Sequence, residues 1–99
     1  MRREELTVKY VDYMPNTKEE GILYVSKKFS IAIHLCPCGC GEQVVTPIKG
    51  DWPGSKSRPD CWGFTEHDDG TVSLSPSIGN FQFKCRSHYF IRHNKIEWV

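Results

Sequence analysis

The sequence predicts a small, mainly β domain: an antiparallel meander or open barrel of seven to eight short strands, stapled by one zinc ion. Three observations lead to this prediction. No stretch of ten residues carries the 3.6-residue period of a helix, short apolar segments alternate with turn residues throughout, and three of the five cysteines fall within five positions. A chain of 99 residues has the length of one domain, so we expect residues 1–99 to form a single unit.

The first half of the chain predicts four strands. We expect them at residues 6–11, 22–26, 30–36 and 44–48. Because side chains alternate along a strand, Ile31, Ile33 and Leu35 share one face of the third strand, and His34 and Cys36 share the other.

The second half begins with a loop at residues 49–60, which hold two prolines, two glycines and two serines among charged residues. Further strands are expected at residues 62–66, 71–75, 81–84, 87–92 and 96–99. Asp69 and Gly70 lie between two alternating segments, which is a strong hairpin signal. We expect the last turn at residues 93–95.

Charge and hydropathy exclude several functions. The 13 Lys and Arg against 12 Asp and Glu give a net charge of +1, whereas nucleic-acid and membrane-surface binders carry a basic excess. We therefore expect neither partner. The longest apolar-leaning run, residues 29–36, is far below the roughly 20 residues of a membrane span. The first residues are charged and lack the apolar core of a secretory signal, so we expect a cytoplasmic protein.

The cysteines predict a metal site. Cys36, Cys38 and Cys40 are too close in sequence to pair well with one another as disulfides. An odd, clustered set in a chain without a signal is typical of metal ligation in a reducing compartment. A bound metal would also stabilise a small β domain that is short of core.

The spacing of the motif favours zinc. In the sequence CPCGCG (residues 36–41), proline and glycine between the thiols predict a tight chelating turn. Cys85 and His88 form a C-x2-H pair much later in the chain. Two close pairs separated by a long insertion are typical of structural zinc, and we predict Cys38, Cys40, Cys85 and His88 as ligands, with Cys36 as the alternative to Cys38.

Two other interpretations of the cysteines remain. A disulfide such as Cys36 to Cys85 is one alternative to metal binding. Cys61, alone beside Trp62, is expected to be an ordinary buried thiol.

Three strings in the sequence resemble a bacterial family of small Cys/His-rich proteins. They are HLCPCGCGE (residues 34–42), EHDDGTVSLSPSIG (residues 66–79) and CRSHYFIRHNKIEW (residues 85–98). The resemblance covers roughly residues 30–99. Members are encoded beside ubiquitin-like proteins and their E1- and E2-like enzymes. The resemblance implies a peptidase or deubiquitinase-like hydrolase, whose partners are a ubiquitin-like protein and the E1- and E2-like enzymes of the same operon.

Three mechanisms of hydrolysis fit the residues. Zinc could activate water, with Glu42 or Glu66 as general base, although four soft ligands would leave little Lewis acidity. A serine and a histidine could do the chemistry beside a structural zinc, and here we predict Ser77 and His34 as catalytic residues. Ser77 follows Pro76, where a bend at a strand end would expose its hydroxyl. Cys36 could instead be the nucleophile, with His34 as base.

A module without catalytic activity is the alternative function. Zinc-stapled β domains of this size also serve to bind a protein partner. Aromatic side chains would suit such a surface or, equally, the core of a small domain. They are Trp52, Trp62, Tyr89, Phe90 and Trp98.

Overall fold

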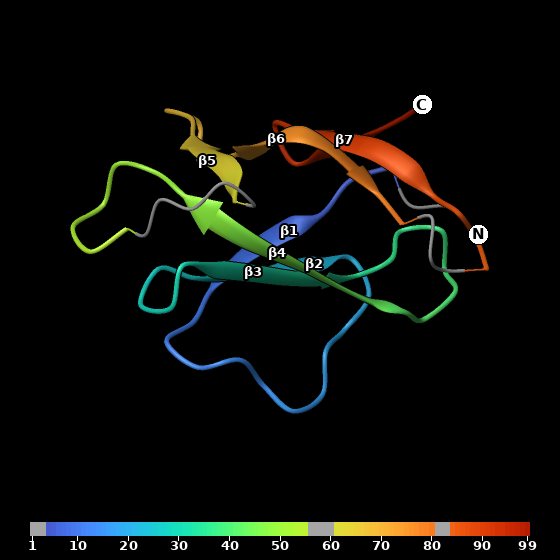
Figure 1. Ribbon diagram of the computed structural model, residues 1–99, viewed down its shortest axis with the longest axis horizontal. Helices are drawn as coiled ribbons and strands as arrows, with labels where there is room; N and C mark the ends of the chain where they lie inside the picture. Colours follow the sequence, from blue (N-terminus) through green and yellow to red (C-terminus); the bar gives the residue numbers. More distant parts are fainter. Residues whose placement is uncertain (1–3, 56–60, 81–83) are drawn as a thin grey trace.

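The chain folds into one eight-stranded sheet that curls into a half-barrel (Figure 1). The computed structural model describes residues 4–55, 61–80 and 84–99. The strands are β1 (Thr7–Tyr10), β2 (Ile22–Ser26), β3 (Ile31–Leu35), β4 (Gln43–Lys49), β5 (Trp62–Glu66), β6 (Val72–Gly79), β7 (His88–Arg92) and β8 (Lys95–Trp98). The described residues contain no helix, so the prediction of a mainly β domain is confirmed.

The order of the strands in the sheet follows their order in the chain, as expected of a meander. The hairpin between β5 and β6 is confirmed: Glu66 pairs with Val72, the N–H of Gly70 donates to the carbonyl of His67, and Gly70 has a φ of 86°. The strand expected at residues 81–84 lies largely outside the described residues, and Lys84 begins a turn.

The sheet is not purely antiparallel, which corrects the prediction. β1 and β2 pair in parallel, and so do β4 and β5. Parallel neighbours need a long connection that returns the chain to the same end of the sheet. Residues 11–21 and the segment between β4 and β5 are the two longest connections. The sequence predicted a loop at residues 49–60 and no strand at residues 12–21.

The junction between β4 and β5 is short. Only two residue pairs join these strands, Ile48 with Trp62 and Lys49 with Gly63. In Figure 1, β4 meets β5 only at its arrowhead and diverges from it toward the other end. The sheet therefore consists of two four-stranded halves that share a narrow contact.

The opposite edges of the sheet come together. Glu5 forms a bridge with Lys95, the N–H of Leu6 donates to the carbonyl of Asn94, and the N–H of Ile96 donates to the carbonyl of Glu4. These bonds close the half-barrel around its core.

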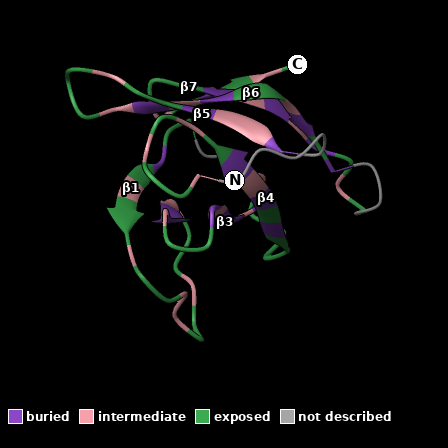
Figure 2. Cartoon of the chain, turned by 60° about the vertical axis from the view of Figure 1, so that its left-hand side comes forward, coloured by how far each residue is buried: buried purple, intermediate pink, exposed green. Residues whose placement is uncertain are grey.

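Most buried residues lie on the strands, where they alternate with exposed ones as in β4, whereas β1 and much of the loops are exposed (Figure 2). Of the two faces predicted for β3, the one carrying His34 and Cys36 is the more deeply buried. Among the aromatic side chains considered for a partner surface, Tyr89 is fully buried, and Trp52, Trp62 and Trp98 pack against the core. They therefore serve mainly to fill a small interior.

Candidate functional site

The CPCGCG segment forms a tight turn between β3 and β4. Its first residue is anchored to the end of the hairpin, because the N–H of Cys36 donates to the carbonyl of Glu42 at 2.8 Å. The N–H of Gly39 then donates back to the carbonyl of Cys36 at 3.1 Å. Gly39 and Gly41 have φ values of 92° and 83°, a conformation that favours glycine. These two glycines let the chain reverse direction between the thiols.

Four of the five thiols lie together. Cys36, Cys38 and Cys40 of this turn meet Cys85 from the segment before β7, and all four sulfur atoms lie within 4.8 Å of one another. The sulfur of Cys36 is 3.4 Å from that of Cys38 and 3.8 Å from that of Cys85, which is itself 3.7 Å from the sulfur of Cys40. All are free thiols, so no disulfide joins Cys36 to Cys85.

This arrangement of sulfur atoms fits a tetrahedral metal ion. Four thiolates at about 2.3 Å from zinc would lie at the corners of a tetrahedron with edges of roughly 3.8 Å. The observed separations match that size. Burial raises the pKa of the Cys36, Cys38 and Cys40 thiols. Burial also opposes ionisation of Cys85, but hydrogen bonds from Ser87 lower the pKa of that thiol to about 6.

His88, predicted as the fourth ligand, does not lie in this group among the described residues, and Cys36 takes that place. The reason is the alternation of side chains along the strand. Ser87 faces the thiols, with its Oγ 3.1 Å from the sulfur of Cys36. The next residue, His88, therefore points to the opposite face of the sheet. Cys61 lies apart from the group and is buried.

A chain of buried polar side chains runs from the thiols into the core. Asn80 donates from Nδ2 to the Oγ of Ser87 at 2.9 Å and to the hydroxyl of Tyr89 at 3.4 Å. The Tyr89 hydroxyl lies 2.7 Å from Nε2 of His34. Burial lowers the pKa of His34 to about 4, so the imidazole is neutral near pH 7. His34, expected to assist Ser77, is thus part of a packed interior network.

Ser77 and His88 face each other on the outer side of the sheet. The Oγ of Ser77 lies 2.8 Å from Nε2 of His88, and both residues are partly buried. Ser77 lies within β6 rather than at the strand end predicted for it. The register between β6 and β7 shifts between Leu74 and Ile78, and this shift decides which residue of β6 lies beside His88. Pro76 indicates an irregularity in this segment, but the sequence does not indicate the register that results.

A second serine and histidine pair occurs at the hairpin. His67 Nε2 lies 2.7 Å from the Oγ of Ser73, while His67 stacks on His93 with ring centroids 3.8 Å apart. The Oγ of Ser73 also accepts a hydrogen bond from the N–H of His93. This serine is therefore engaged in holding the turn, and sequence analysis did not single it out.

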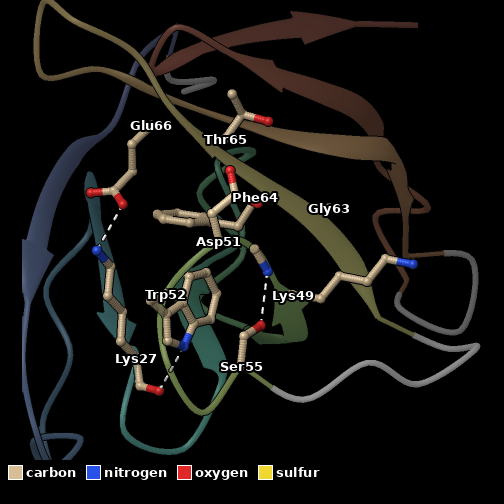
Figure 3. Close-up of a pocket in the computed structure, with 10 residues that line it drawn as sticks. Lys27, Lys49, Asp51, Trp52, Ser55, Gly63, Phe64, Thr65 and Glu66 are labelled. Carbon is tan, nitrogen blue, oxygen red and sulfur yellow. Dashed lines mark hydrogen bonds and ion pairs between the residues drawn. The ribbon is translucent and has the colours of Figure 1, made fainter.

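A cavity of about 750 Å³ lies elsewhere, between the loop after β4 and the outer part of β5 (Figure 3). Lys27 and Glu66 form an ion pair across it at 2.7 Å. Hydrogen bonds from Lys27 and Tyr10 lower the pKa of Glu66. The indole of Trp52 and the ring of Phe64 meet edge to face inside the cavity. The cavity wall contains neither the thiol group nor Ser77 and His88.

Glu42 and Glu66, the two candidate bases for a zinc-bound water, have different surroundings. Glu42 is exposed and contributes its main-chain carbonyl to the turn. Glu66 is held by Lys27 and Tyr10 at the large cavity. Neither carboxylate is among the groups that lie against the thiols in the described structure.

A smaller cavity of about 290 Å³ lies next to Ser77. It is lined by residues 43–46 of β4, residues 78–80 and Trp62, whose indole N–H donates to the carbonyl of Ser77 at 3.4 Å. The chain thus combines a partly exposed group of four thiols, a serine and histidine pair on the outer face, and a narrow cavity next to Ser77.

A family model described as bacterial ubiquitination-like system serine protease (BubE) matches residues 10–99. No curated protein and no solved structure matches the chain. The described residues also include no helix long or apolar enough to cross a membrane.

Proposed function

Because this chain belongs to the BubE family of bacterial ubiquitination-like system serine proteases, we propose that Ser77 is its nucleophile and His88 its general base. The substrate is the C-terminal region, or a conjugate, of a ubiquitin-like protein. The observation that carries the assignment is the 2.8 Å separation between Ser77 Oγ and His88 Nε2. This is the contact that an activated serine requires.

The chemistry follows from that contact. Ser77 Oγ attacks the carbonyl carbon of the scissile bond while His88 Nε2 accepts the hydroxyl proton. The imidazolium then gives this proton to the leaving amine, and the carbon–nitrogen bond breaks to leave an ester on Ser77. Water, deprotonated by His88, hydrolyses the ester and releases the new carboxyl terminus.

The main chain supports the two groups rigidly. β7, which carries His88, is hydrogen-bonded on both sides, to β6 and to β8. The carbonyl of His88 accepts a hydrogen bond from the N–H of Val99 at 3.0 Å. A catalytic pair on paired strands keeps its geometry better than one on loops.

The four clustered thiols suit a zinc ion with a structural role. Four thiolates complete its tetrahedron and leave no position for water, so the residues favour serine chemistry over a metallopeptidase. Zinc would hold the turn after β3 against the segment that leads into β7. Since Ser87 contacts this group and His88 is the next residue, zinc would help to fix the position of the base.

The partners that we propose are the ubiquitin-like protein encoded beside this chain and the E1- and E2-like enzymes of the same system. A reducing compartment suits the free thiols, so we propose the cytoplasm as the place of action. The family description, which refers to a ubiquitination-like system, supports partners in that pathway.

The test is cleavage of the ubiquitin-like precursor, or its conjugates, by purified variants. Ser77→Ala should lower kcat/KM by at least about 10³-fold and His88→Ala by about 10²–10⁴-fold, with unchanged zinc content and melting temperature. Ser73→Ala and His67→Ala are matched controls, because they form the second serine and histidine pair, and they should retain activity.

Other outcomes would replace this assignment. Activity that survives Ser77→Ala but disappears with Cys36→Ala would make the thiol the nucleophile. Dependence on Glu42 or Glu66 instead would indicate a zinc-bound water. A wild-type protein that binds the ubiquitin-like protein without cleaving it would be an interaction module.

A further inference from the structure

Among the described residues, no strand fills the place between the first half of β4 and the last residues of β6. β5 separates these strands only near the junction of Ile48 with Trp62. Beyond it, residues 43–46 of β4 and residues 78–80 face each other across the 290 Å³ cavity, with Trp62 at its end. This volume is at the lower limit of ligand sites, so the cavity admits only a narrow chain segment.

The main chain of β4 is directed into this cavity. Residues opposite each other in an antiparallel pair exchange hydrogen bonds at every second position. The N–H of Ile48 donates to Ser30, and the residues of β4 that bond β3 are therefore those at even numbers, such as Val44. The N–H and carbonyl groups of Gln43 and Val45 point away from β3, and no described strand pairs with them.

The main chain of β6 provides the opposite wall. The N–H of Asn80 donates to the carbonyl of Ser87, so Asn80 and Ile78 bond β7. The groups of Gly79 are consequently directed away from β7, toward the cavity. A glycine within a strand is typical of a place where another backbone approaches closely.

We propose that an extended peptide, the C-terminal tail of the ubiquitin-like substrate, inserts here as an additional strand between β4 and β6. Its main chain would hydrogen-bond Val45 on one side and Gly79 on the other. Gly79 is two residues from Ser77, so the inserted strand would carry the scissile bond past the nucleophile. This inference rests on the proposed function and adds to it the mode of substrate recognition.

Main-chain pairing explains which substrates would fit. Hydrogen bonds to backbone groups require an extended, unfolded segment, and the small cavity favours residues with small side chains. A tail that projects from a folded domain satisfies the first condition, whereas an internal strand of a folded protein does not.

The first test removes one N–H from the proposed wall. Val45→Pro deletes the N–H that faces the cavity and leaves the bonds to β3 intact, while Val45→Ala is the matched control that keeps it. Pro47 of β4 lies, like Val45, at an odd-numbered position whose N–H would not bond β3, so the strand already accepts a proline on this side. Val45→Pro should lower kcat/KM on the ubiquitin-like precursor about three- to tenfold or more below the value for Val45→Ala, which keeps the N–H.

The second test does not depend on folding of the proline variant. Hydrogen–deuterium exchange is measured on the inactive Ser77→Ala protein with and without the uncleaved precursor. The amides of Gln43, Val45 and Gly79 should become protected when the precursor is bound. The exposed amide of Gly54 lies in a distant turn and is the internal control.

The outcomes separate this inference from the proposed function. If wild type does not cleave, or if Ser77→Ala cleaves normally, the proposed function fails. If Ser77 is required but Val45→Pro cleaves like wild type, strand insertion at this place is wrong. Unchanged exchange at Val45 and Gly79 in a saturated complex would also overturn it.

Discussion

Replacing Tyr89 by phenylalanine deletes one buried oxygen atom and tests the polar network behind the thiol group. Tyr89 is fully buried, and its hydroxyl lies 2.7 Å from Nε2 of His34 and accepts a longer bond from Asn80. The other ring nitrogen of His34 has no hydrogen-bond partner among the described residues. Tyr89→Phe therefore leaves a fully buried imidazole without any hydrogen bond to the described part of the chain.

The cost can be worked out from these contacts. An unsatisfied buried donor or acceptor costs about 1–3 kcal/mol, and the short bond to His34 places its loss in the upper part of that range. The long bond to Asn80 adds little. We expect a loss of about 2–3 kcal/mol, which for a domain of this size lowers the melting temperature by about 8–24 °C.

The assay is denaturant unfolding of the zinc-loaded protein, followed by fluorescence. Tyr13→Phe is the control, because its hydroxyl is bonded to Lys28 on the surface and its removal should change stability by less than about 0.5 kcal/mol. The double variant His34→Leu/Tyr89→Phe removes both partners and should recover part of the loss. A single Tyr89→Phe variant as stable as wild type would refute the reasoning.

Three further changes test the hairpin turn, the thiol group and the large cavity. Gly70→Ala should destabilise the protein by about 1–2 kcal/mol in thermal unfolding because of its positive φ, whereas Gly63→Ala, which meets only ordinary contacts, should be neutral. Elemental analysis should find one zinc per chain in wild type and Cys61→Ala but not in Cys85→Ser, and equal zinc in all three would rule out the thiol group as its site. Glu66→Gln should cost less than about 1 kcal/mol at pH 7, since the ion pair is partly exposed. The folded state lowers the pKa of Glu66, so the contribution of the ion pair is present above the ordinary pKa and is lost as the pH falls through the folded pKa. A difference from wild type that does not shrink as the pH is lowered would contradict this assignment.

The sequence predicted the strands well because each one follows a local rule. Short runs of β-branched and aromatic residues identified β2 and β5 at the residues where the structure has them, and Asp69-Gly70 identified the hairpin. The parallel pairs were beyond prediction, since nothing in residues 11–21 indicates on which side β2 will return. Local patterns establish which segments are strands but not the direction in which they pair.

The candidate site was predicted only in part, for a related reason. The spacing of the cysteines and His88 predicted a metal site, but spacing does not indicate on which face of β7 the side chain of His88 lies. That face follows from Ser87, whose contact with Cys36 is visible only in three dimensions. The proximity of Ser77 to His88 depends on a register shift in β6, and neither composition nor periodicity indicates the register that results.

The seam that closes the half-barrel has a consequence for the order in which the chain folds. Every strand pair of the sheet joins consecutive strands, and Leu74 with Ile91, 17 positions apart, is the widest pairing among them, so all of these pairs close much shorter loops than the seam does. The bridge between Glu5 and Lys95 instead closes a loop of 90 residues, which costs roughly 2 kcal/mol more entropy than a ten-residue loop. We expect the seam to form last during folding and to open first under native conditions, so that the amides of Leu6 and Ile96 exchange faster than those of the hairpins.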